Sequence, residues 1–261
     1  MNLIESKSNT HIKEVRKLKD RKYRNGKHEF LIEGFRFLEE ALKSEFEISM
    51  IFIRSSSVEK WEKYKEKHKI KENVCSEAYD VEDSIFKTIS DTDNSQGVIA
   101  VVHDKKLDIQ CRNGFYILAD KIQDPGNMGT IIRSAHASGA LGVIITKGTV
   151  DVYNQKTLRA TMGSIFHVPI IYDDNLENTI MLKKSGFKIA ASMLETELNF
   201  YNAEFNDKTI LAVGNEGNGL SDEIKDIADI KVRIPMPGGA ESLNASVAAS
   251  IMMFELVRRG L

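Results

Sequence analysis

The sequence predicts an α/β protein with two domains and mostly parallel sheets, and three observations predict it. Short apolar runs alternate with amphipathic segments along almost the whole chain, which is typical of strand–helix–strand units. The length of 261 residues suggests one large domain or two ordinary ones. A polar, aperiodic stretch divides the pattern and predicts a linker. The expected parts are therefore a basic N-terminal arm (1–27), a small α/β domain (28–104), the linker (105–113) and a second α/β domain (114–261).

In the small domain, the alternating pattern predicts four strands and three helices. The predicted strands are short apolar runs over residues 28–34, 48–54, 72–78 and 96–103. The predicted helices cover residues 34–44, 57–69 and 80–90, and Asp80 is the expected N-cap of the third. Because strands and helices alternate, we expect a largely parallel sheet.

The sequence of the second domain predicts a longer series of alternating strands and helices. Its strands are expected at residues 115–120, 140–146, 187–193, 209–214 and 230–235, and one helix and one further strand share residues 154–171. Other helices are expected at residues 129–138, 178–186, 221–228 and 242–260. Gly139 ends the first of these helices. In the last one we expect Ser242 as the N-cap, with Leu243, Val247, Ile251 and Phe254 along one apolar side.

The composition excludes several classes of protein. With 42% hydrophobic and 28% charged residues and a net charge of −2, the chain is neither disordered nor collagen-like. Cys75 and Cys111 are isolated and form no CxxC or Cys/His cluster, so we expect no metal site and a reducing compartment. The first thirty residues lack the apolar core of a signal peptide, and no apolar run approaches the roughly 18 residues of a membrane span. We therefore expect a cytoplasmic protein without a membrane segment.

The N-terminal arm carries a strong positive charge. Nine basic residues face only three acidic ones between Met1 and Lys27. Ile12, Val15 and Leu18 form one narrow apolar stripe, so a helix here can dock by the stripe and present its charge outward. One interpretation is a phosphate-contacting surface, and the alternative is a solvated helix face. The candidate RNA contacts are Arg16, Lys17, Arg21, Lys22 and Arg24.

Three loops of the second domain carry unusual polar residues. In the first, the turn Asp124-Pro125-Gly126-Asn127 opens the helix that bears Arg133. Turn and capping chemistry explains the Pro and Gly, but a guanidinium on a mostly apolar helix is costly to bury without an anionic partner.

The other two loops are rich in glycine. In AVGNEGNG, three glycines allow close approach of a ligand to the backbone and surround Glu216, although an exposed turn is the alternative. This loop is not a GxGxxG fingerprint and does not follow the first strand, which disfavours an ordinary dinucleotide-binding fold. In IPMPGGAESLNASVAAS, capping explains Ser242 but leaves Asn244 without a structural role.

Together these blocks resemble the three motifs of the SpoU-type (TrmH-like) RNA 2′-O-ribose methyltransferases of the SPOUT superfamily. The segments DPGNMGTIIRSAHASGA, ILAVGNEGNGLS and IPMPGGAESLNASVAAS match in order and spacing, and the similarity covers residues 114–261. Residues 28–104 also resemble the small N-terminal substrate-binding domain of that family. Three ordered blocks across a whole domain form a specific signal.

The resemblance implies a mostly parallel α/β sheet whose C-terminal segment forms a deep trefoil knot, a homodimer, and the use of S-adenosylmethionine without a metal. A ribose 2′-hydroxyl attacks the sulfonium methyl group in line. The residues that the resemblance, or their position within its motifs, assigns to the cofactor are Gly214, Ile234, Leu243, Asn215 and Met236. Met193, at the end of the predicted strand 187–193, is expected to line the same slot. The catalytic set that it implies is Arg133, Asn127, Glu216, Ser242 and Asn244, with Glu216 as the expected charge partner of Arg133.

The resemblance leaves the role of Arg133 and the identity of the RNA open. A guanidinium almost never loses its proton in proteins, so Arg133 either has a lowered pKa at the dimer interface or stabilises the developing alkoxide while a water or phosphate takes the proton. Lys156 and Arg159 are further RNA candidates. Family analogy favours ribosomal RNA over transfer RNA. The remaining alternatives are a non-catalytic RNA-binding protein and a methyltransferase that acts on a base nitrogen.

Overall fold

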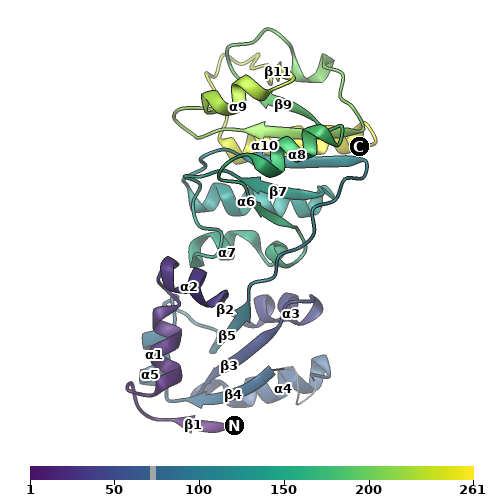
Figure 1. Cartoon of the computed structure of the whole chain (residues 1–261). Coiled ribbons are helices and arrows are strands. Elements are labelled where there is room, and N and C mark those ends of the chain that lie inside the picture. Colours follow the sequence, from purple (N-terminus) through teal and green to yellow (C-terminus); the bar gives the residue numbers. More distant parts are fainter. Residues whose placement is uncertain (71–74) are drawn as a thin grey trace. The chain divides into compact units, whose positions relative to one another are not determined.

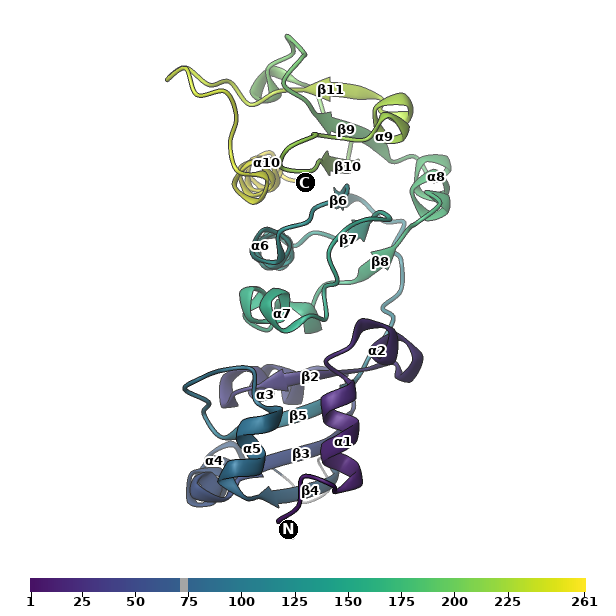
Figure 2. The ribbon, with the colours of Figure 1, turned by 90° about the vertical axis from the view of Figure 1, so that its left-hand side faces the viewer.

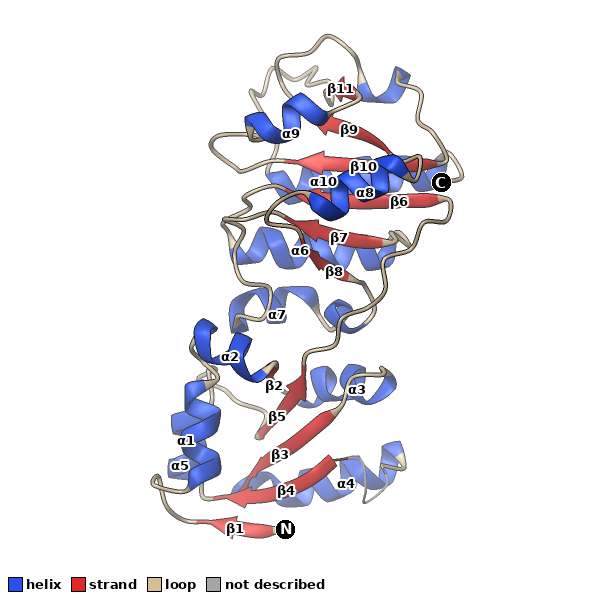
Figure 3. Cartoon of the chain, viewed as in Figure 1, coloured by secondary structure: helices blue, strands red, loops and turns tan. Residues whose placement is uncertain are grey.

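The chain forms two compact units, each with its own sheet (Figures 1 and 3). The computed structural model describes residues 1–70 and 75–261. Unit 1 comprises residues 1–105 and 153–158, and unit 2 comprises residues 106–152 and 159–261. The basic N-terminal segment thus belongs to unit 1.

Unit 1 is built on a five-stranded sheet in the order β1-β4-β3-β5-β2. Its strands are β1 (Asn2–Ile4), β2 (Glu29–Glu33), β3 (Ile48–Arg54), β4 (Cys75–Val81) and β5 (Val98–His103). The sheet is mixed rather than largely parallel, because β5 lies between β3 and β2 and runs antiparallel to both. Residues 72–74 of the predicted third strand lie outside the described residues.

The expected N-cap at Asp80 is wrong. Asp80 lies inside β4, where it pairs with Leu3 of β1 and Ile53 of β3, and the cap of the following helix is Glu82. Pairing on both sides extends β4 further than its own apolar run indicates, so the N-cap of the helix lies two residues later than expected.

Four helices cover the two faces of this sheet (Figure 2). One face carries α1 (Thr10–Lys17) and α5 (Asp83–Ile89), and the other carries α3 (Phe35–Lys43) and α4 (Val58–His68). Ile12, Val15 and Leu18 join the buried cluster that also contains Phe52 and Phe86. The predicted apolar stripe therefore does dock α1 onto the sheet.

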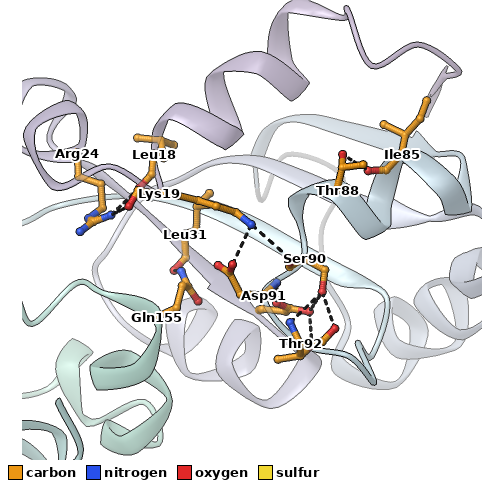
Figure 4. Close-up of polar contacts among 11 residues, drawn as sticks. Leu18, Lys19, Arg24, Leu31, Ile85, Thr88, Ser90, Asp91, Thr92 and Gln155 are labelled. Carbon is orange, nitrogen blue, oxygen red and sulfur yellow. Dashed lines mark hydrogen bonds and ion pairs between the residues drawn. The ribbon is translucent and has the colours of Figure 1, made fainter.

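Arg24 does not belong to the basic surface that the sequence predicts for this segment. It lies in α2 (Arg21–Lys27) and is only 7% exposed. Its Nη1 donates hydrogen bonds to the carbonyls of Leu18 (2.8 Å) and Lys19 (2.7 Å), at the C-terminal end of α1 (Figure 4). This guanidinium satisfies main-chain acceptors that α1 leaves unpaired, and this internal role disfavours the predicted RNA contact.

The other candidates in this segment are more accessible. Lys17, Arg21 and Lys22 are exposed. Arg16 is half-buried and donates to Thr88 Oγ1 at 2.5 Å. Lys19 is tied to Asp91 at 2.8 Å (Figure 4).

Replacing Arg24 tests its internal role. Arg24→Ala should lower the free energy of unfolding of unit 1 by about 2 kcal/mol, because one buried and one partly buried carbonyl lose a charged donor. Arg21→Ala, an exposed residue of the same helix, should change it little. Urea unfolding followed by circular dichroism measures both. Unchanged stability of Arg24→Ala together with weaker RNA binding would return Arg24 to the RNA-contacting set.

Unit 2 contains a six-stranded sheet in the order β11-β9-β10-β6-β7-β8, and every strand pair is parallel. The strands are β6 (Gly114–Ala119), β7 (Gly142–Ile145), β8 (Ile170–Tyr172), β9 (Lys188–Ser192), β10 (Lys208–Val213) and β11 (Ile230–Val232). The central strands are almost continuously buried, as expected where helices cover both faces. The expected parallel sheet is confirmed for this unit.

The helices of unit 2 form two layers (Figure 2). One layer contains α6 (Pro125–Ala137) and α10 (Ala245–Arg258), and the other contains α8 (Glu177–Lys184) and α9 (Asp222–Ile227). The short helix α7 (Gln155–Thr161) crosses the boundary between the two groups of residues. The threading of the C-terminal segment through a knot stays a prediction.

Helix α10 differs from the expected helix at its start and on its faces. It begins at Ala245, and its N-cap is Asn244 rather than Ser242. Its buried residues are Ser246, Ala249, Met252, Met253 and Leu256. Val247 and Phe254, expected along one apolar side of the helix, are 46% and 49% exposed, so that side is not buried within the chain.

The C-terminal end of α10 is fixed by charged hydrogen bonds. Arg258 and Arg259 donate to the Glu255 carboxylate and lower the pKa of that group to about 2. Arg259 also donates to the carbonyls of Ala203 (2.6 Å) and Tyr201 (2.7 Å). The loop after β9 is thereby tied to the last helix.

Candidate active site

The parallel sheet of unit 2 brings the three polar loops to one edge. Because all its strands run the same way, the loops after β6, β10 and β11 leave from the same side. From β6 the chain continues to β7 and β8 on one side of the sheet, whereas β9, β10 and β11 lie on the other side. The β6–β10 pair is therefore the point at which the strand order changes direction. In open α/β sheets, ligands bind outside the carboxyl ends of the strands at such a point.

A cleft of about 470 Å³ lies at this edge, in the size range of small-molecule sites. Its walls come from the segments that follow β9, β10 and β11 and from the start of α10. All the residues that the sequence assigns to the cofactor line it: Met193, Gly214, Asn215, Ile234, Met236 and Leu243. Glu216 and Ser242 line it as well.

A chain of hydrogen bonds joins the three loops. Asn127, near the start of α6, donates from Nδ2 to Glu216 Oε1 at 2.8 Å. Its Oδ1 accepts from Asn244 Nδ2 at 2.8 Å and from Ser246 Oγ at 3.2 Å. One carboxamide therefore connects the loops after β6, β10 and β11.

Asn244 has the structural role that the sequence left unexplained. Its Oδ1 accepts from the main-chain N–H groups of Ser246 (3.0 Å) and Val247 (3.3 Å), as an N-cap does. This cap fixes the Asn244 side chain, whose Nδ2 then points to Asn127. The first helical turn of α10 thus orients the polar chain.

The glycine loop after β10 is closed by its own backbone. Asn215 and Gly219 exchange main-chain hydrogen bonds of 2.9 and 3.0 Å, and Asn215 Oδ1 accepts from the N–H groups of Gly217 and Asn218. A Cβ at Gly214 would lie 2.1 Å from the carbonyl carbon of Gly219. Only glycine lets the two ends of this loop approach so closely.

Two residues of the site escaped the sequence analysis. Asp120, only 1% exposed, accepts from Thr146 Oγ1 (2.7 Å) and from the N–H of Ser221 (2.6 Å), so it anchors the end of the glycine loop to β6. The position of Asp120 directly after an apolar strand is the feature of the sequence that could have identified it. Ser246 belongs to the polar chain, and it lies beside the predicted Asn244 within the same motif.

The structure does not join Arg133 to Glu216. Arg133 is exposed on α6 and has no hydrogen bond or ion pair within the described part of the chain. The expected pairing is wrong for the single chain, because Asn127 already holds Glu216 at the start of the helix. Ser242 is exposed and does not cap α10, since Asn244 occupies that position. Lys156 and Arg159 are exposed on α7.

Neither a metal centre nor a membrane span is found among residues 1–70 and 75–261. These residues contain no group of three His, Cys, Asp or Glu side chains placed to hold a metal ion together. None of the helices formed by them has the length and apolar character needed to cross a bilayer.

The glycine loop offers a matched test of the cleft. Gly214→Ala should displace the loop, because the new Cβ would collide with main-chain atoms of Gly219 and Leu220, and S-adenosylmethionine should no longer raise the melting temperature. Gly238→Ala is the control, since Gly238 does not line the cleft and its Cβ would meet nothing within 4 Å. Calorimetric scans with and without the cofactor compare them. Equal cofactor stabilisation in both variants would contradict the proposed cleft geometry.

Comparison with known proteins agrees with this geometry. The model of the SpoU rRNA Methylase family matches residues 114–254, and that of the MRM3-like substrate binding domain matches residues 9–100. The 23S rRNA (guanosine(2553)-2′-O)-methyltransferase RlmP of Bacillus subtilis is 33% identical over 260 residues, which cover 98% of this chain and 99% of that protein.

Two solved structures share the whole fold. The AdoMet-bound rRNA methyltransferase of Sinorhizobium meliloti has a TM-score of 0.85 at 30% identity, covering 100% of this chain and 98% of that one. The SpoU methyltransferase AviRb of Streptomyces viridochromogenes, in complex with AdoMet, has a TM-score of 0.86 at 27% identity, covering 97% and 98%. With the family model, the near full-length relative and the three hydrogen-bonded motif loops in agreement, the chain belongs to the SpoU rRNA methylase family.

Proposed function

We propose that this chain transfers a methyl group from S-adenosylmethionine to the 2′-hydroxyl of a nucleotide in 23S ribosomal RNA. The observation that carries the proposal is the hydrogen-bonded chain Glu216–Asn127–Asn244, which ties three motif loops together beside the cleft. The relatives that cover the whole chain are named rRNA methyltransferases, which favours ribosomal RNA over transfer RNA. The first nucleotide to test is the guanosine that corresponds to position 2553.

The residues of the cleft fit S-adenosylmethionine. Met193, Ile234 and Leu243 offer apolar surface, and the main chain of the glycine loop offers hydrogen-bonding groups for an adenine. Glu216 supplies negative charge near a sulfonium. When bound, the cofactor supplies an electrophilic methyl group. We assign Gly214, Asn215 and Met236 to the same site.

The polar chain and Arg133 have separate roles in this proposal. Asn127, Asn244 and Ser242 position the ribose by hydrogen bonds, with Glu216 holding the Asn127 carboxamide in one orientation. Arg133 is exposed and has no anionic partner within the described residues, so its charge is available to RNA. We assign it to stabilising the alkoxide that develops on the ribose, while a water or an RNA phosphate accepts the proton.

The two units divide the work. Unit 1, which matches a substrate-binding domain, presents Lys17, Arg21 and Lys22 at its surface, and such residues bind phosphates without reading sequence. We also assign Lys156 and Arg159 on α7 to phosphate binding. Arg16 is half-buried and is expected to contribute less to phosphate binding. Because the proposed substrate is ribosomal RNA, we assign the protein to the cytoplasm.

A comparison of cells with and without the chain tests the function. Deleting the gene should remove one 2′-O-methylation from 23S rRNA, and the wild-type chain should restore it. Mapping of 2′-O-methyl positions in total RNA measures this. An unchanged map, or a methylation lost from transfer RNA instead, would contradict the proposed substrate.

Measuring methyl transfer also tests the role of Arg133. Arg133→Ala should abolish methyl transfer while the affinity for S-adenosylmethionine stays within several-fold, because Arg133 does not line the cleft. Lys147→Ala serves as a control that removes an exposed charge elsewhere in unit 2. Undiminished turnover of the Arg133 variant would refute the assignment.

A homodimer is part of the proposal. Val247, Phe254 and Val257 are 46%, 49% and 40% exposed and share one side of α10, which leaves an apolar stripe without cover in the single chain. Residues of this stripe lie on the helix that forms part of the cleft wall. Association of two copies through α10 would cover the stripe.

Substitutions on two helices test the dimer. Phe254→Asp should convert the dimer to a monomer, because it places a charge in the apolar stripe. Ile180→Asp, at a residue that is 42% exposed on α8 in the opposite layer, should leave the assembly intact. Light scattering after gel filtration gives both masses. A dimeric Phe254→Asp variant would argue against α10 as the interface.

A further inference from the structure

The charges that line the cleft have an uneven distribution. Among the lining residues, the charged side chains are Glu195, Glu216, Glu241 and Lys225. Three are acidic and one is basic. Lys225 comes from α9, which packs on the face of the sheet opposite to α6 and α10.

This pattern matches the charges of the cofactor. S-adenosylmethionine carries positive charge on its sulfonium and on its α-ammonium group, and negative charge only on its α-carboxylate. The acidic residues suit the two cationic groups. The single ammonium in the cleft, that of Lys225, is the matching partner for the single anionic group.

The main alternative partner for a carboxylate is already occupied. Helix N-termini bind anions through unpaired N–H groups, and the start of α10 lies at the cleft. There, however, Asn244 Oδ1 accepts from the N–H groups of Ser246 and Val247. The capped first turn of α10 therefore offers little to an incoming carboxylate.

Lys225 is available for this contact. Its side chain is 31% exposed, and its Nζ lies 3.3 Å from Asp222, a carboxylate that is itself 90% exposed. Ion pairs of this kind, three residues apart on a helix surface, contribute little. The described residues provide no other partner for Nζ, so donors remain for a ligand.

We propose that Lys225 binds the α-carboxylate of S-adenosylmethionine and thereby positions the amino-acid end of the cofactor. The proposal rests on the use of that cofactor by this chain. Lys225 is a binding residue in this role, and it takes no part in the transfer of the methyl group.

Two ligands that differ only in the carboxylate test the proposal. Isothermal titration calorimetry on the full chain compares S-adenosylmethionine with decarboxylated S-adenosylmethionine, which retains the sulfonium and the amine. Lys225→Ala should weaken the first ligand roughly three- to tenfold, the scale of a partly exposed charged contact, and leave the second within about twofold. Lys225→Gln, which keeps most of the side-chain stem, should behave in the same way.

A neighbouring lysine provides the matched control. Lys231 is exposed on β11 and does not line the cleft, so Lys231→Ala removes the same charge and should change neither affinity. Melting temperatures of the variants confirm that each is folded.

The possible results separate the proposal from its premise. Equal weakening of both ligands by Lys225→Ala, with no effect of Lys225→Gln, would mean that the stem packs on the adenosine, and the proposal would be overturned. Unchanged affinity for S-adenosylmethionine in both variants would overturn it too. If the wild-type chain bound neither ligand, the proposed function would fail together with this assignment.

Discussion

The carboxamide of Asn127 is the contact on which the site depends. It donates to Glu216 and accepts from Asn244 and Ser246, and these partners belong to the loops after three different strands. A carboxylate can only accept hydrogen bonds, so Glu216 fixes which end of the amide faces it. The opposite end must then face Asn244, and the three loops are held as one piece.

The scaffold makes this convergence possible. Parallel strands deliver their carboxyl ends to one edge, and the insertion of β10 between β6 and β9 brings the glycine loop next to the loop that opens α6. Asp120 then anchors the end of the glycine loop to the first strand of the unit. The packed sheet thus supplies the rigidity that a positioning site requires.

Local patterns in the sequence predicted most elements and many of the residues around the cleft. Apolar runs predicted the strands of unit 2, and two of the three motifs predicted residues that line the cleft, while the first motif is joined to them by the hydrogen bonds of Asn127. The failures have tertiary causes. Asp80 became part of β4 because strands pair with it on both sides, and Arg24 became buried because the end of α1 needs a donor.

Tertiary contacts also explain the failed predictions for α10 and Arg133. Ser242 and Asn244 are both good capping residues, and the sequence alone does not decide between them, whereas in the fold Asn244 caps α10 and also donates to Asn127. The expected ion pair between Arg133 and Glu216 failed because a neutral amide takes the carboxylate first. The sequence contains groups that are able to interact, and the fold decides which of them meet.

The pairing of β6 with β10 has a consequence for biosynthesis. Gly114 pairs with Lys208, so the centre of the sheet joins segments that are far apart in the chain. Closing such a long loop is slow, and it cannot begin until β10 has left the ribosome. The capping turn of α10 follows later still. During translation, the nascent protein therefore completes the cleft only after the segment up to Ala248 has emerged.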